Sequence, residues 1–258
     1  MFVINDLVCI KSDINKIVYS IVNIEENIAF LEGYIYRIKT SVTIDDIEYA
    51  SDDLILKEDN TLNKVLDKTT KQRVRSSNKV IYGTVLHIDG DEKFLNSCVE
   101  LYKEMNIHCW GLHIKENQIK NCINKILDEI TPDIVVLTGH DYFNGKDIKD
   151  INNYENTLKF IEVIRLIRRR FDKDSVIIIA GACSSHFESL IANGANFASS
   201  PKRINIHTYD PAVIAIKCAT TSCNQTIDFN NLLKFIENGR DAYGAIETKG
   251  KMKLLMWG

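Results

Sequence analysis

Two hydrophobic runs that each end in a reactive side chain constrain this chain more than any other feature. The first run is Asp133-Ile-Val-Val-Leu-Thr-Gly-His140, and the second is Ser175-Val-Ile-Ile-Ile-Ala-Gly-Ala-Cys183. Their length and β-branched content are typical of strands buried on both faces of a parallel sheet. The carboxyl ends of such strands form the ligand crevice of an open α/β sheet. If the two strands are neighbours, His140 and Cys183 emerge side by side at that crevice.

A histidine beside a cysteine is the minimal set for thiol nucleophilic catalysis. Each residue alone has a simpler interpretation, because a cysteine after an apolar run is usually a small core residue. A histidine at a strand end is, in the same way, usually an ordinary loop residue. Caspases place an Ala-Cys motif about 50 residues after their histidine. The equivalent positions of His140 and Cys183 therefore favour a Cys–His dyad, and the core interpretation stays open at this stage.

Composition excludes several classes of protein. The chain has 258 residues, 45% of them hydrophobic, which fits one large or two modest globular domains. Its net charge of −3 gives no general basicity that would indicate a nucleic-acid partner. The seven cysteines are scattered and form no C-x-x-C pair, so we expect no zinc site, no other metal or cofactor, and a reducing compartment.

Neither a leader nor a membrane segment is predicted. The first residues, Met1-Phe-Val-Ile-Asn-Asp6, lack the basic and apolar regions of a signal peptide. No apolar run approaches the roughly 20 residues that cross a bilayer. We therefore expect no membrane partner.

The chain divides into three predicted parts. Residues 1–52 contain short alternating β-branched and aromatic runs, which predict a small antiparallel β-barrel, SH3-like, or a curled sheet. Whether it binds a peptide or nucleic acid or only adds stability stays open. Residues 53–79 are polar and predict a solvated linker, because few large apolar residues are available for burial. Residues 80–258 form the third part.

Strands and helices alternate in 80–258, which predicts a doubly wound α/β fold with a parallel sheet. The apolar face of the long third helix is expected at Leu158, Ile161, Ile164 and Ile167. The predicted strands are 85–89, 107–113, 134–138, 176–180 and 196–199. The predicted helices lie near 92–105, 117–129, 153–171, 184–193 and 211–219.

Five blocks of the third part together form a recognisable pattern. They are the segment 181–201 around Cys183, with its beginning Gly-Ala-Cys-Ser-Ser-His, and Val85-Leu-His-Ile-Asp-Gly-Asp91, Leu137-Thr-Gly-His-Asp141, Arg203-Ile-Asn-Ile-His207 and Gly244-Ala-Ile-Glu-Thr248. In these blocks the chain resembles the YabG family of sporulation-specific proteases. These blocks cover most of 80–250, and the N-terminal part matches more loosely. The layout also resembles the caspase, gingipain and clostripain clan, whose first strand lies between the second and third.

The resemblance implies a cysteine endopeptidase with a caspase-like parallel-sheet sandwich. Its implied substrates are spore coat and related spore proteins, cleaved preferentially after arginine. The implied location is the mother-cell cytoplasm of a sporulating bacterium, or the spore coat. The oligomeric state is not indicated.

Thiol chemistry then assigns roles to residues at the two strand ends. Cys183 attacks the scissile carbonyl as a thiolate, helped by the start of the following helix, and His140 protonates the departing amine. N–H groups from Gly139 to Asp141 and at Cys183 are the expected oxyanion hole. The clan usually has glycine where this chain has Asp141, whose side chain is expected to crowd the hole, to steady the imidazolium or to contact a basic substrate.

A pocket for arginine needs a carboxylate, which pairs with guanidinium in bidentate geometry. Asp89 and Asp91 are the leading candidates, although an Asp-Gly-Asp-Glu sequence is equally typical of a capped turn. Glu188 is a weaker candidate, and His186 is not expected to be a second catalytic histidine. The clan uses the edge near the fifth strand to bind substrate backbone, so Ser199, Ser200 and Arg203 are further candidates, with an ordinary β–α loop as the alternative.

Other functions fit less well. A class I glutamine amidotransferase has Gly-x-Cys-x-Gly with its histidine downstream, whereas this chain has Gly-Ala-Cys-Ser-Ser and an upstream His140. No Gly-x-Gly-x-x-Gly follows the first strand, so dinucleotide binding is weakly supported. A non-catalytic scaffold for spore-coat assembly with a peptide-binding barrel stays open.

The polar link carries a further expectation. Arg73 and Arg75 lie in it, and exposed polar segments are preferred sites of proteolytic nicking. Combined with the arginine preference that the resemblance implies, this predicts self-cleavage that leaves a fragment starting near Val74 or Ser76.

Overall fold

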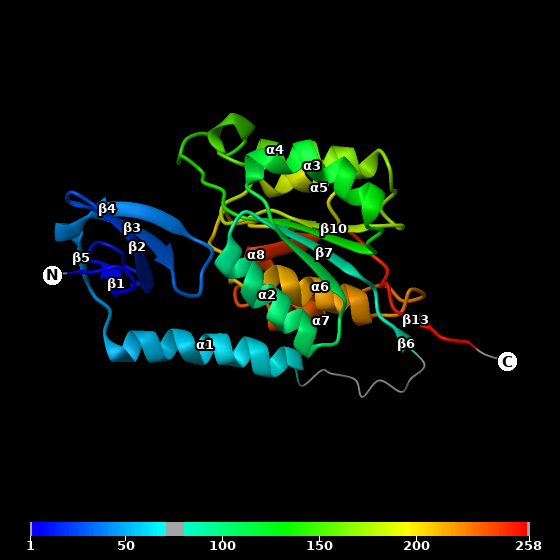
Figure 1. The fold of residues 1–258 in the computed structure, drawn as a ribbon, viewed down its shortest axis with the longest axis horizontal. Helices are drawn as coiled ribbons and strands as arrows, with labels where there is room; N and C mark the ends of the chain where they lie inside the picture. The colour runs from blue at the N-terminus through cyan, green and yellow to red at the C-terminus, as the bar shows by residue number, and fades with distance from the viewer. Residues whose placement is uncertain (1, 71–79, 257–258) are drawn as a thin grey trace. The chain divides into compact units, whose positions relative to one another are not determined.

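A computed structural model describes residues 2–70 and 80–256. It divides into an N-terminal unit, 1–67, and a C-terminal unit, 68–258, each with its own dense internal packing. The fold is mixed α/β, with an antiparallel sheet in the first unit and a mainly parallel sheet in the second. Each unit is described separately, with its elements labelled as in Figure 1.

The N-terminal unit contains five antiparallel strands in the order β4-β3-β2-β1-β5. Alternation of apolar side chains directs Val8, Tyr19, Ile21, Ala29, Leu31 and Ile47 into one core. The strands are β1 (Leu7–Ile10), β2 (Tyr19–Glu25), β3 (Ile28–Gly33), β4 (Lys39–Thr43) and β5 (Ile47–Tyr49), with the 3₁₀ turn η1 (Ile44–Asp46) before β5.

Helix α1 (Asp52–Thr70) occupies most of the segment predicted as a polar linker. It makes polar contacts with residues that flank strands β2 and β3: Glu58 Oε1 accepts the N–H of Val18 at 2.9 Å, and the Tyr34 hydroxyl donates to Asp59 Oδ1 at 2.8 Å. The remaining predicted linker residues, 71–79, lie outside the described residues, and so do Arg73 and Arg75.

The C-terminal unit is built on a six-stranded sheet in the order β12-β11-β10-β9-β7-β8. All neighbours are parallel except β11 and β12. Its strands are β7 (Val85–Asp89), β8 (Cys109–His113), β9 (Ile134–Thr138), β10 (Ile177–Ala180), β11 (Phe197–Ser199) and β12 (Tyr243–Ala245). A small two-stranded sheet pairs β6 (Val80–Ile81) with β13 (Lys253–Leu254).

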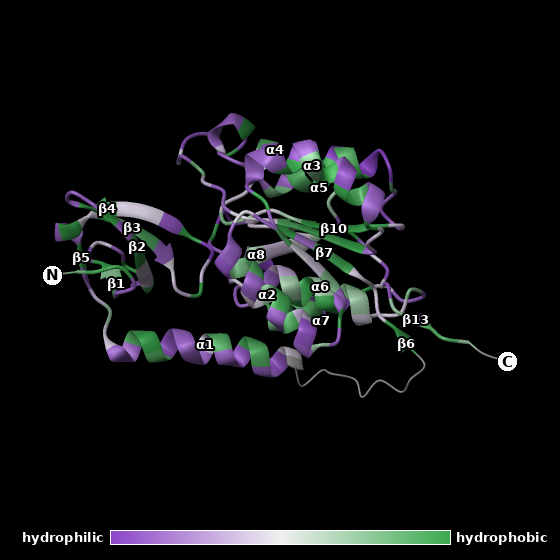
Figure 2. Cartoon of the chain, in the orientation of Figure 1, coloured by the Kyte–Doolittle hydropathy of each residue, from purple (hydrophilic) through white to green (hydrophobic). Residues whose placement is uncertain are grey.

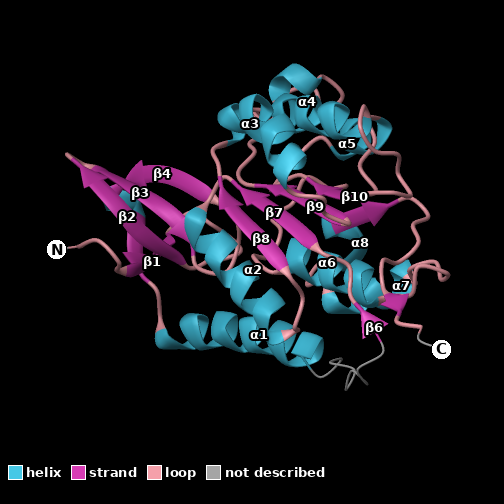
Figure 3. Cartoon of the chain, turned by 45° about the vertical axis from the view of Figure 1, so that its right-hand side comes forward, coloured by secondary structure: helices cyan, strands magenta, loops and turns pink. Residues whose placement is uncertain are grey.

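Helices cover both faces of this sheet. Figures 1 and 3 show α3 (Glu116–Glu129), α4 (Thr157–Arg168) and α5 (Phe187–Ala192) on one face, and α2 (Glu92–Glu104) and α6 (Asp210–Thr220) on the other. The shorter elements are η2 (Ile151–Asn153), α7 (Phe229–Leu232), η3 (Leu233–Phe235) and α8 (Gly239–Ala242). The predicted doubly wound arrangement is confirmed.

The apolar core lies between the sheet and its helices. Strands β7, β9 and β10 are buried at every position. The sequences of β9 and β10 are almost entirely apolar, and Figure 2 shows β10 as hydrophobic, whereas β7 also buries His87 and Asp89. The expectation that Leu158 lies on the buried face of its helix is wrong, because Leu158 is 41% exposed. Helix α4 begins only at Thr157, so Leu158 lies in its first turn. Its buried face is instead formed by Phe160, Ile161, Ile164 and Ile167.

Candidate active site

His140 and Cys183 follow neighbouring strands at the same offset. Strands β9 and β10 pair in parallel with Leu137 opposite Ala180, and the N–H of Gly181 extends the ladder to the carbonyl of Leu137 at 3.0 Å. Each reactive residue stands three positions beyond its member of that pair. The predicted adjacency of the two strands is therefore confirmed, and both residues enter loops at the same edge of the sheet.

The loop that carries Cys183 is held by the segment after β11. Cys183 is 4% exposed, and its Sγ accepts the N–H of Ile206 at 3.3 Å. An N–H donor of this kind stabilises negative charge on sulfur. The hydroxyls of Ser199 and Ser200 donate to the carbonyl of Ala182 at 2.7 and 3.1 Å. Both serines are fully buried, and their hydrogen bonds to Ala182 fix the backbone next to Cys183.

The helix expected directly after Cys183 begins later than predicted. Helix α5 starts at Phe187, and its N-cap is His186, whose Nδ1 accepts the N–H of Ser189 at 3.2 Å. The residues between Cys183 and His186 form a loop, in which Ser184 has φ +58°. The predicted start at 184 is wrong, so Cys183 does not stand in the first turn of the helix. His186 caps this helix.

His140 is fixed at its backbone and at its ring. Its N–H donates to Glu116 Oε1 at 2.7 Å, and its carbonyl accepts from Asn156 Nδ2 at 2.8 Å. Its Nε2 lies 3.0 Å from Asp91 Oδ2. The imidazole is 22% exposed, whereas the Asp91 side chain is almost completely buried. The imidazole is thus held beside a carboxylate and still reaches the surface.

Asp89 and Asp91 both have partners inside the protein. Asp91 is the N-cap of α2, since its Oδ1 accepts the N–H of Phe94 at 3.2 Å while its other oxygen contacts His140. Asp89 is completely buried, its Oδ1 accepts the N–H of Asp91 at 2.9 Å, and its Oδ2 lies 3.6 Å from His87 Nε2. The capped-turn interpretation of Asp91 is confirmed, and its carboxylate has the additional contact with His140.

The Asp141 carboxylate is directed into the protein. Its Oδ2 accepts the hydroxyls of Ser185, at 2.8 Å, and of Thr157. Its Oδ1 accepts the backbone N–H groups of Asn156 at 2.7 Å and of Tyr142 at 3.0 Å. Burial nevertheless raises the pKa of Asp141, against the effect of these hydrogen bonds. The side chain therefore has four donors around it and joins the histidine loop to the cysteine loop.

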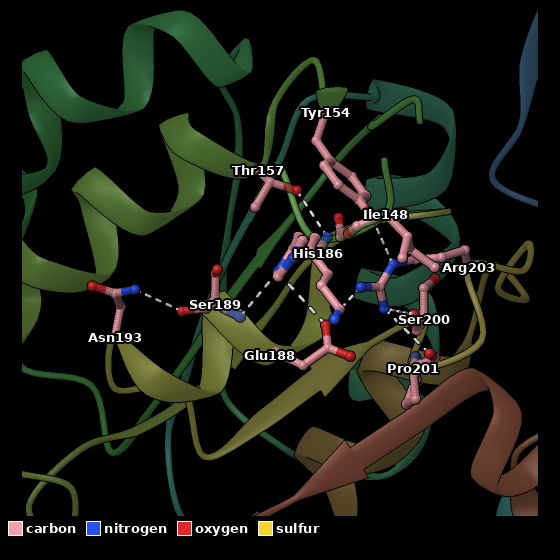
Figure 4. A network of polar contacts seen from close by, with 12 residues as sticks. Ile148, Tyr154, Thr157, His186, Glu188, Ser189, Asn193, Ser200, Pro201 and Arg203 are labelled. Carbon is pink, nitrogen blue, oxygen red and sulfur yellow. Dashed lines mark hydrogen bonds and ion pairs between the residues drawn. The ribbon is translucent and has the colours of Figure 1, made fainter. Parts of the chain in front are cut away.

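Arg203 lies in a network of polar contacts next to the cysteine loop (Figure 4). Its guanidinium donates to the Tyr154 hydroxyl at 2.8 Å, to Glu188 Oε2 at 2.6 Å, and to the carbonyls of Ser200 and Pro201 at 3.2 Å each. It also lies over the Tyr154 ring, 5.5 Å from the centroid. Desolvation raises the pKa of the Glu188 carboxylate, but the hydrogen bond from Arg203 lowers it, and the pKa lies below its usual value. The Arg203 side chain is 7% exposed and fixes the loop that follows β11.

Sequence reasoning missed Glu116, the first residue of α3. Its carboxylate lies against two glycines: a Cβ on Gly90 would be 2.1 Å from Glu116 Oε1, and a Cβ on Gly139 would be 2.2 Å from it. The signal available in the sequence was that Gly90 and Gly139 directly follow the paired strands β7 and β9. Close approach of another group to the backbone is one reason for glycine at such positions.

Comparison with known proteins gives two matches. The family model described as YabG peptidase U57 matches residues 3–256. The sporulation-specific protease YabG of Bacillus subtilis (strain 168) is 40% identical over 177 residues, which cover 67% of this chain and 61% of that protein. No solved structure matches the chain. Within 2–70 and 80–256, no helix combines the length and apolar character needed to cross a membrane.

Proposed function

Because the chain belongs to the YabG peptidase U57 family, we propose that it is a cysteine endopeptidase of sporulation with a Cys183–His140 dyad. The observation that carries this proposal is the equal offset of the two residues on paired parallel strands. A buried core cysteine needs no histidine at the equivalent position of the next strand, whereas thiol catalysis requires that pair at one edge.

The proposed reaction follows from this arrangement. The Cys183 thiolate attacks the scissile carbonyl carbon and forms a tetrahedral intermediate, with the Ile206 N–H favouring the charged sulfur before attack. His140 then gives a proton to the departing amine, and the acyl group stays on sulfur as a thioester. Water, deprotonated by His140, hydrolyses this thioester and restores the thiol.

We propose that Asp91 orients His140. A carboxylate at 3.0 Å from Nε2 keeps the proton on that nitrogen and stabilises the imidazolium that forms when Cys183 is ionised. The N–H groups of Gly139, Asp141 and Cys183 stay our candidates for the oxyanion hole. The neighbouring N–H of His140 is bound to Glu116 and is not a candidate.

The proposed substrates are spore coat and related spore proteins, cleaved after arginine. Asp89 and Asp91 stay our candidates for the arginine-binding carboxylate. Each also has partners inside the protein, since Asp89 accepts the N–H of Asp91, and Asp91 caps α2 and contacts His140. Ser199, Ser200 and Arg203 support substrate binding indirectly, by fixing the segment beside Cys183. We expect the protein in the mother-cell cytoplasm or the spore coat.

We also propose finer classes for the two units. Strand β7 lies between β8 and β9, which is the order implied by the caspase-like clan. In the N-terminal unit, β1 pairs with both β2 and β5, as expected of an SH3-like barrel. We propose 1–52 and 80–258 as the two domains, joined by 53–79.

The test incubates the 258-residue protein with an arginine-containing spore coat protein and maps the cut sites by mass spectrometry. Cys183→Ala and His140→Ala should each lose cleavage by several orders of magnitude while keeping the far-ultraviolet circular dichroism of the wild type. Cys218→Ala is the matched control, because Cys218 is completely buried in α6 and burial raises the pKa of its thiol. Near-normal cleavage by Cys183→Ala would refute the dyad, whereas absence of cleavage by the wild type would favour a non-catalytic scaffold.

A further inference from the structure

Two hydroxyl groups connect the cysteine loop to a single carboxylate. The N–H of Ala182 donates to Ser185 Oγ at 2.9 Å, and this hydroxyl donates to Asp141 Oδ2 at 2.8 Å. The N–H of His186 donates to Thr157 Oγ1 at 3.0 Å, and this hydroxyl also donates to Asp141 Oδ2. Figure 4 shows Thr157 beside the backbone of His186. The two donors, Ala182 and His186, stand on either side of Cys183.

The other carboxylate oxygen belongs to the histidine side of the site. Oδ1 accepts the N–H groups of Asn156 and Tyr142, and the Asn156 amide also donates to the carbonyl of His140. Ser185 and Thr157 are completely buried, and Asn156 is nearly so. The carboxylate therefore lies between the loop of the proposed nucleophile and the loop of its proposed base, and the buried hydroxyls of Ser185 and Thr157 bond to it from the interior.

We propose that Asp141 is the positioning residue that fixes the Cys183 loop against the His140 loop. This inference rests on the proposed Cys–His function and adds a residue that does not touch the substrate through its side chain. It also explains why aspartate is tolerated where the caspase-like clan usually has glycine. Four donors hold the carboxylate in the interior, so the side chain does not crowd the oxyanion hole for which the N–H of Asp141 is a candidate.

An ionised carboxylate suits this position better than an amide. Each hydroxyl already accepts an N–H from the cysteine loop, so each has its own proton left to donate. The side chain at position 141 must therefore accept hydrogen bonds at both of its terminal atoms. A carboxylate has two acceptor oxygens, whereas an asparagine amide has one acceptor oxygen and one NH₂ donor. Asp141→Asn would place an NH₂ group against donors and break one side of the connection.

The experiment uses the 258-residue protein and an arginine-containing peptide substrate. Thr157→Val and Ser185→Ala each remove one hydroxyl, and each should lower kcat about 10- to 100-fold with KM within about threefold of wild type, as expected for a displaced catalytic pair. Thr157→Ser keeps the hydroxyl and should restore most of kcat. The rate at which iodoacetamide alkylates Cys183 should fall in parallel with kcat.

The matched control is Thr84→Val. Thr84 donates through its hydroxyl to Asp133 Oδ2 at 3.1 Å, next to the amino ends of β7 and β9 and therefore at the opposite edge of the same sheet. The Thr84→Val variant should lose about as much thermal stability as Thr157→Val, and its kcat should equal that of the wild type. If Thr157→Val and Ser185→Ala keep kcat within about twofold and lose only stability, Asp141 is a structural residue and the proposal is overturned. Full activity in Cys183→Ala would instead refute the proposed function itself.

Discussion

Replacing Asp91 by asparagine would separate the two roles of the Asp91 side chain. Asp91 caps α2 through Oδ1 and contacts His140 Nε2 through Oδ2. Asparagine and aspartate are equally good N-caps, so Asp91→Asn should keep the capping bond to Phe94. Its second polar atom is then an NH₂ group, which donates to His140 instead of accepting from it. The substitution favours the tautomer with the proton on Nδ1 and removes the charge that stabilises the imidazolium.

The size of the effect follows from the contact. A hydrogen bond to a charged group contributes about 1.5–3 kcal/mol, and each 1.36 kcal/mol corresponds to about tenfold in rate. Asp91→Asn should therefore lower kcat/KM about 10- to 150-fold, with little change in the free energy of unfolding. Asp91→Ala should lose the rate and, in addition, about 1 kcal/mol of stability from the missing cap.

The assay is steady-state cleavage of an arginine peptide, combined with urea denaturation of each variant. Asp228→Asn is the control, because Asp228 caps α7 through the same kind of bond, to the N–H of Asn231 at 3.0 Å. It should leave both rate and stability unchanged. If Asp91→Asn keeps kcat/KM within about twofold of wild type, the contact with His140 has no catalytic role and Asp91 is only a helix cap.

Three further predictions concern other parts of the chain. Burial raises the pKa of Glu58 to about 7 from its ordinary 4.5, so the wild type should lose stability as pH rises from about 4.5 to 7, and Glu58→Gln should flatten this profile in calorimetry. Arg203→Lys cannot reproduce the forked contacts of the guanidinium and should lower the free energy of unfolding by about 1–3 kcal/mol in urea denaturation. Wild-type protein should slowly cut itself after Arg73 or Arg75, seen by terminal sequencing, and an equal cut in Cys183→Ala would disprove self-cleavage.

The strands of the parallel sheet were predictable because burial on both faces leaves a simple sequence signal. The runs at 85–89 and 134–138 are strands with the predicted bounds, and the adjacency of the histidine and cysteine strands followed from one βαβ unit. Strand β12 was missed because three residues, Tyr243-Gly-Ala245, are too short to show a period. Helix α1 was missed because its composition is polar and its burial comes from tertiary contacts such as Glu58 with Val18.

The contacts of the candidate site were less predictable than its two central residues. Direction of the Asp141 side chain depends on Thr157 and Ser185, which are distant in sequence and carry no pattern that identifies them as its partners. The late start of α5 has the same origin, because Ser185 bonds to Ala182 and Asp141 in a loop conformation. The helix propensity of residues 184–186 depends on their own side chains and gives no information about such tertiary hydrogen bonds.

Three helix starts meet at His140, and this explains why capping signals and site signals overlap in the sequence. Asp91 is the N-cap of α2, Glu116 is the first residue of α3, and Asn156 is the N-cap of α4. They bind, in that order, the ring, the N–H and the carbonyl of His140. In a parallel α/β sheet every crossover helix begins at the carboxyl edge, where the reactive residues also lie. A polar residue at a helix start there can therefore cap its helix and orient a neighbouring group with different atoms. Of the three, Asp91 has both roles, because its side chain caps α2 and contacts the ring of His140, whereas the side chain of Asn156 makes no cap bond. Only a substitution that keeps the cap, such as Asp91→Asn, separates the two roles of Asp91.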